Sequence, residues 1–99
     1  MGVDVAWEGT DGTIETIGDP EGLLASALQS LRCDECPTLQ RIDIYHRAEL
    51  PPGDALIHDM TRLRDRTPDP NTREHLSRVL SLIRRAASRP ATTLTFMGD

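Results

Sequence analysis

The two cysteines of the chain stand close together in the stretch RCDECP, residues 32–37, where Cys33 and Cys36 form a C-x-x-C motif. Cysteines at this spacing can bind zinc or form a redox couple. A redox role requires a stabilised thiolate, which a helix N-terminus or nearby cations provide. Here the motif follows the expected C-terminus of a helix, and Asp34 and Glu35 separate the sulfurs. These surroundings disfavour a thiolate.

A zinc site would need ligands from outside the motif. Structural zinc takes four ligands, so the two cysteines require two of the three histidines. Cys33, Cys36 and His46 form the best partial set, but their spacing does not match a compact Cys₂His₂ finger. We keep this set as an alternative. We expect two small side chains packed in the turn before Pro37, with no metal and no cofactor.

No catalytic motif is complete in this chain. It has no G-x-G-x-x-G, no G-K-[ST] and no H-E-x-x-H, and it contains no lysine. Tyr45, Arg47 and Glu49 surround His46 and could form an acid–base group with it, although a histidine bonded to solvent or backbone explains the pattern better. We therefore favour a protein that is not an enzyme, with a small enzyme or metalloprotein centred on the C-x-x-C motif as a further alternative.

Charge is distributed unevenly along the sequence. All 11 basic residues are arginine, a composition typical of GC-rich bacteria, and the net charge is −5. Residues 1–36 carry a net charge of −7, and residues 37–99 carry +2. This acidity disfavours general binding of nucleic acid, because backbone phosphates require a positive field.

The length and the hydrophobic runs set the class of protein. A chain of 99 residues suits one domain, spanning 1–99. Its longest apolar runs are only a few residues, so no membrane span is expected. The first residues, MGVDVAWEG, lack a basic head followed by an apolar stretch, so no secretory signal is expected. We predict a cytoplasmic protein with reduced thiols.

Periodicity and cap residues predict the order ββαβααβ. The predicted strands are 3–8, 13–17, 39–47 and 92–97, and the predicted helices are 20–32, 55–66 and 72–88. Each helix has a single apolar stripe, and the strands alternate in polarity. These patterns predict an α+β fold: a two-layer sandwich in which helices cover one face of a four-stranded, mainly antiparallel sheet.

Capping residues predict where helices start, and Asp54 is the expected cap of the second helix. Asp19 followed by Pro20 is typical of an N-cap and a first helical position. Asn71 and Glu74 have the N-x-x-E spacing of a capping box. The expected core of this last helix is Leu76, Val79, Leu80, Ile83 and Ala87.

Residues 39–47 are expected to form the central strand. If the helices cover the side that carries Ile42 and Ile44, the side chains of Leu39, Arg41, Asp43 and Tyr45 face outward. Tyrosine and arginine are enriched at protein interfaces, so Tyr45 and Arg41 are candidate binding residues.

The last helix carries a row of arginines. Arg78, Arg85 and Arg89 recur at i, i+7 and i+11, roughly opposite the apolar stripe. Such a row can bind phosphates or carboxylates, or it can be a solvated face in which Glu74 pairs with Arg78.

The leading hypothesis is a small non-enzymatic protein-interaction or regulatory module, of an immunity, antitoxin or accessory type. It would bind a protein partner or a second copy of itself. The alternative is nucleic-acid binding through Arg78, Arg85 and Arg89.

Overall fold

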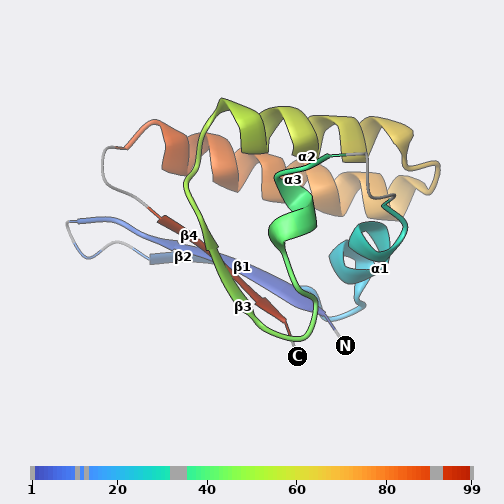
Figure 1. Ribbon diagram of the computed structural model, residues 1–99, viewed down its shortest axis with the longest axis horizontal. Coiled ribbons are helices and arrows are strands. Elements are labelled where there is room, and N and C mark those ends of the chain that lie inside the picture. Colours follow the sequence, from blue (N-terminus) through green and yellow to red (C-terminus); the bar gives the residue numbers. More distant parts are fainter. Residues whose placement is uncertain (1, 11, 13, 32–35, 90–92, 99) are drawn as a thin grey trace.

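The computed structural model describes residues 2–10, 12, 14–31, 36–89 and 93–98. Within these residues, helices cover one face of a four-stranded sheet (Figure 1). The elements in chain order are β1 (Val3–Glu8), β2 (Ile14–Ile17), α1 (Leu23–Gln29), the 3-10 helix η1 (Leu39–Arg41), β3 (Arg47–Leu50), α2 (Asp54–Arg66), α3 (Pro70–Ala87) and β4 (Thr93–Gly98). The predicted α+β class and the order ββαβααβ are confirmed.

The sheet is antiparallel throughout, with the strand order β2-β1-β4-β3. The last strand in the sequence, β4, therefore lies in the middle of the sheet, between β1 and β3. Val3, Val5 and Trp7 are buried on the face that the helices cover, as their alternation predicts. Val5 pairs with Ile17 on β2, so the predicted β1–β2 hairpin is also confirmed.

The predicted central strand at 39–47 is wrong. Residues 39–41 form η1, and the strand β3 begins only at Arg47 and lies at the edge of the sheet. Leu39 and Ile42 are both buried, although they stand three residues apart. In a strand they would face opposite sides, whereas a 3-10 turn places them together. Burial of these two side chains has overridden the β-propensity of the segment.

Helix α1 begins later than predicted. Its N-cap is Gly22, whose φ of 68° is a left-handed conformation that glycine adopts readily. Asp19, the predicted N-cap, and Pro20, the predicted first residue, both precede the helix. Asp19 still caps the helix from a distance. Its Oδ1 accepts a hydrogen bond from the amide of Leu24, and its Oδ2 accepts one from the amide of Ala25, both at 3.1 Å. Helix α1 also ends before its predicted limit.

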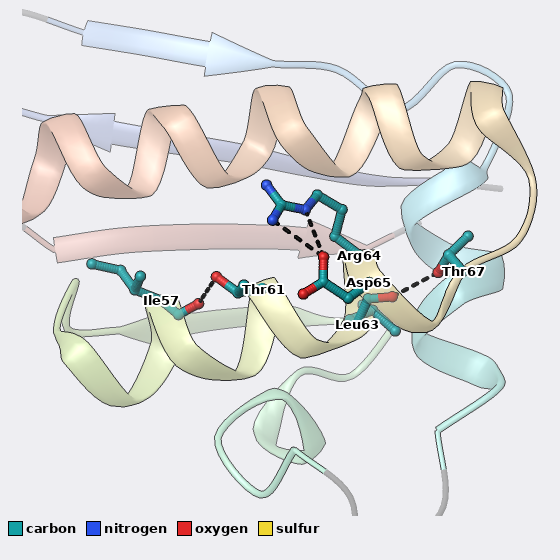
Figure 2. A network of polar contacts seen from close by, with 6 residues as sticks. All are labelled: Ile57, Thr61, Leu63, Arg64, Asp65 and Thr67. Carbon is teal, nitrogen blue, oxygen red and sulfur yellow. Dashed lines mark hydrogen bonds and ion pairs between the residues drawn. The ribbon is translucent and has the colours of Figure 1, made fainter.

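Helix α2 matches its predicted range closely, and Figure 2 shows polar contacts made within it and just past its end. The hydroxyl of Thr67 donates to the carbonyl of Leu63 at 2.7 Å, which satisfies one of the free carbonyls at the helix end. Arg64 donates from Nε and Nη2 to one carboxylate oxygen of Asp65, at 3.2 Å each. These contacts stay within one turn of chain, so they stabilise the end of α2 and do not join it to another element.

The cap of α3 differs from the prediction. Asp69, and not Asn71, is the N-cap, and its Oδ2 accepts from the hydroxyl of Thr72 at 2.7 Å and from its amide at 2.9 Å. These two donors, the hydroxyl first, hold the pKa of Asp69 below its ordinary value. Ala87 is exposed, and Ala86 takes the place expected for it in the core.

The core lies between the sheet and the helices. Leu94 and Phe96 of the central strand β4 are fully buried against it. The predicted core residues that are buried on α2 and α3 are Leu56, Met60, Leu63, Leu76, Val79, Leu80 and Ile83. The helices therefore present their apolar stripes to one side of the sheet, and the other side carries no described element (Figure 1).

Candidate functional site

Cys36 is part of the core and is not placed for chemistry at the surface. It is buried, and its Sγ donates to the backbone carbonyl of Asp59 at 3.4 Å. Asp59 is itself buried on α2, and its Oδ2 accepts from the amide of Thr38 at 2.7 Å. Cys36 therefore belongs to a turn that two atoms of Asp59 hold against α2.

The histidine of the proposed metal set lies in different surroundings. The side chain of His46 is 74% exposed, and its Nδ1 lies 2.8 Å from Oδ2 of Asp43. Cys33 lies outside the described residues. Among the residues that are described, no three histidine, cysteine or acidic side chains are arranged to hold a metal ion. The set Cys33, Cys36 and His46 therefore stays a prediction.

Asp43 organises the turn before β3. Its Oδ1 accepts from the amide of Tyr45 at 2.8 Å, the geometry of an Asx turn. The Tyr45 amide first, and then His46, hold the pKa of Asp43 below its ordinary value. The carboxylate thus fixes where the side chains of Tyr45 and His46 leave the backbone.

Tyr45 and Arg41 were predicted to face outward from a strand, and both are exposed, but they stand on a turn and on η1. Together they line a hollow of about 350 Å³ beside the end of α1, where Leu28 and Gln29 form the opposite wall. The side chain of Tyr45 is 54% exposed. Leu39, which was predicted to share this outward face, is buried in the core.

Each arginine of the predicted row has a partner within the chain. Arg78 donates to Glu74 at 3.0 Å, the i, i+4 pair expected for a solvated helix face. Arg85 donates through Nε to Glu15 of β2 at 2.9 Å. The guanidinium of Arg89 lies 5.7 Å from the centre of the Trp7 ring, within the range of a cation–π contact. Nucleic-acid binding through these arginines stays a prediction.

A buried carboxylate and a histidine form a contact that the sequence analysis missed. Oδ1 of Asp19 lies 3.3 Å from Nε2 of His75 on α3, and the two side chains are 1% and 11% exposed. Nε2 makes no hydrogen bond within the described residues, so this is a close approach of the two groups and not a hydrogen bond. The sequence did contain a sign that His75 faces the core. The buried residues Val79 and Leu82 follow it at i+4 and i+7, so the three side chains lie on one face of the helix.

A groove of about 730 Å³ opens beside this pair. Glu21, Asn71, Glu74 and Arg78 lie at its polar walls. Asp19 and His75 also line this groove; the carboxylate of Asp19 already accepts hydrogen bonds from three backbone amides, and Nε2 of His75 is buried. The pair therefore ties α3 to the start of α1.

The uncovered face of the sheet has a hollow of about 580 Å³ at its middle. The register places three rows of side chains across the strands on this face. From β2 towards β3 the rows are Asp4, Met97 and Arg47; Thr16, Ala6, Thr95 and Glu49; and Ile14, Glu8 and Thr93. The middle row contains short side chains at its centre, which is why the face is hollowed there.

The rim of this hollow is polar, and Glu8, Arg47 and Glu49 are its charged residues within the described part of the chain. Arg47 donates to Glu49 at 3.1 Å on the edge strand β3, and this pair is neutral overall. Glu8 is exposed and has no ion pair within the described part of the chain. Ile14 stands beside Glu8 with 64% of its side chain exposed, so an apolar contact surface adjoins an unpaired carboxylate.

Comparison with protein families, with curated proteins and with solved structures finds no match for this chain. In the described residues, no helix has the length and apolar character needed to cross a bilayer.

Proposed function

We propose that the protein is a small, non-enzymatic interaction module that binds another protein at the open face of its sheet. The supporting observation is the hollow in that face, where Ala6 and Thr95 lie between longer side chains. Ile14 at its edge and Met97 supply apolar contact area beside the charged side chains of Glu8, Arg47 and Glu49, a combination that protein interfaces use.

The wider proposal keeps the regulatory role expected from the sequence. A protein of this kind would act in the bacterial cytoplasm as an immunity, antitoxin or accessory protein. The pairing of the α3 arginines with Glu74 and Glu15 favours this role over nucleic-acid binding, because it reduces the positive field on that helix.

Partner capture by matched variants tests the proposal. Ala6→Arg fills the hollow with a long charged side chain, whereas Ala87→Arg adds the same side chain to an exposed position on α3. Both variants are first checked for cooperative unfolding near the wild-type midpoint. Proteins captured from a lysate of the source cells are then compared across the three baits.

We expect Ala6→Arg to lose at least one protein that the wild type and Ala87→Arg both retain. Identical capture by all three baits would remove the open face as the binding site. If Ala6→Arg does not fold, Thr95→Arg introduces the same bulk on β4 and decides the question.

A further inference from the structure

The charged side chains of the open face determine which sign of charge a partner must carry there. Among the described residues of its strands, the face carries three carboxylates, those of Asp4, Glu8 and Glu49, against one guanidinium, that of Arg47, which is already bonded to Glu49. The whole chain has a net charge of −5. A second copy would bring the same excess of carboxylates against this one, and like charges repel. The charge pattern therefore favours a basic partner over self-association.

The area of the face limits the size of what it can bind. Four strands about 4.8 Å apart, with the longest strands six residues long at about 3.4 Å per residue, span roughly 19 by 20 Å. The opposite face of the same sheet is packed against helices, so a sheet of this width accepts a helix. A single α-helix has a diameter of about 10–12 Å with its side chains, so one helix laid on the sheet fits this width.

The middle row determines which side chains such a helix would place inward. Ala6 and Thr95 leave the recess shallow, and Ile14 and Met97 stand on either side of it. Leucine or methionine side chains at i, i+3, i+4 and i+7 of a helix would fill it. Basic residues beside that stripe would reach Glu8, the rim carboxylate that has no ion pair in the described structure.

We infer that the open face binds one amphipathic helix of a partner protein, whose apolar stripe is flanked by arginine or lysine. This inference rests on the proposed function and names the chemistry of the partner. Glu8 supplies the charge selection, and the recess at Ala6 and Thr95 supplies the apolar contact.

Two synthetic helical peptides serve as probes. One has a leucine stripe flanked by arginines, and the other has the same stripe flanked by glutamates. Each is titrated into the ¹⁵N-labelled protein, and amide shift changes give both the site and the Kd. We expect the arginine peptide to bind and to shift the amides of β1 and β4, whereas the glutamate peptide does not bind.

Charge reversal supplies a matched pair of variants. Glu8→Arg should raise the Kd of the arginine peptide about tenfold, while Glu21→Arg, an exposed carboxylate in the turn before α1, should leave it within about twofold. Binding should also weaken in 1 M salt, where the Debye length falls to about 3 Å.

Any of three results of the peptide titrations would overturn the inference: equal binding of both peptides, equal effects of the two reversals, or shifts confined to the groove between α1 and α3. Concentration-dependent dimers that Ala6→Arg abolishes would also overturn it, because a second copy would then occupy the face.

If no peptide binds although Ala6→Arg still loses a captured partner, the helix inference fails and the proposed function stands. If capture is insensitive to Ala6→Arg, the proposed function itself fails.

Discussion

Oδ1 of Asp19 lies 3.3 Å from Nε2 of His75, so a buried carboxylate joins the loop before α1 to the second turn of α3. The same carboxylate accepts hydrogen bonds from the amides of Val3, Leu24 and Ala25, at 3.0–3.1 Å. One side chain thus connects the first strand, the first helix and α3. The carboxylate replaces the water that these amides would otherwise bind, and its burial is tolerated because its oxygens are satisfied.

Removing this carboxylate should destabilise the fold strongly. Asp19→Ala leaves three backbone amides without their acceptor, and we expect a loss of about 3 kcal/mol or more in the free energy of unfolding. Urea denaturation followed by far-UV circular dichroism measures this. Glu21→Ala, at an exposed position nearby, should change stability by less than about 0.5 kcal/mol. Similar losses in the two variants would contradict the role given to Asp19.

His75 should matter less than Asp19, because its Nε2 makes no hydrogen bond. We expect His75→Leu, which keeps most of the buried volume, to cost less than about 1.5 kcal/mol. His75→Asp should cost more, since it places a second carboxylate beside the buried Asp19. Equal midpoints of urea unfolding for these two variants would show that the 3.3 Å contact has no electrostatic consequence.

The 3-10 turn at residues 39–41 and a strand at 39–47 predict different effects of substitutions at Leu39 and Arg41 on stability. Leu39 is buried and Arg41 is exposed, although a strand would place them on one face. Leu39→Ala should therefore cost about 2–4 kcal/mol through the cavity it leaves. Arg41→Ala should be nearly neutral, within about 0.5 kcal/mol. Thermal or urea unfolding of both variants decides between the two arrangements.

The cap of α3 should give a pH-dependent contribution to stability. The pKa of Asp69 is held below its ordinary value by the hydroxyl and the amide of Thr72. These bonds therefore stabilise the fold above the ordinary carboxyl pKa, and that stabilisation is lost as the pH falls through the lowered value. We expect Asp69→Ala to lower the thermal midpoint at neutral pH, with the difference from wild type shrinking in acid.

Asn71→Ala is the control for that experiment, since Asn71 was the predicted cap and makes no such bond in the described structure. Its thermal midpoint should differ little from wild type at any pH. A pH-dependent loss in Asn71→Ala, with none in Asp69→Ala, would restore the capping box inferred from the sequence.

Gly98, at the end of β4, is in close backbone contact with the turn before β3. Its amide donates to the carbonyl of His46 at 3.0 Å, and a Cβ at this position would collide with the carbonyl oxygen of Ile44. We expect Gly98→Ala to destabilise by about 1–3 kcal/mol, because the backbone must shift to admit the methyl group. Gly53→Ala is the control, since a Cβ there meets nothing nearby. Equal unfolding midpoints for the two variants would contradict this close contact.

The sequence by itself determined the class of fold and most of the elements. Alternation in VDVAWE specified which face of β1 is buried, because side chains of a strand point to opposite faces in turn. The apolar spacing of Leu56, Met60 and Leu63 likewise specified the buried side of α2. These signals are local, so neighbouring residues suffice to show them.

Only the tertiary structure decided what depends on distant contacts. Nothing near residues 39–42 in the chain shows that the core will bury both Leu39 and Ile42, and that burial replaced a strand with a 3-10 turn. The partnership of Asp19 with His75 spans the chain in the same way, as does the pairing of β4 between β1 and β3. The hollow in the open face also arises from this pairing, because the sheet register brings Ala6 beside Thr95 from opposite ends of the chain.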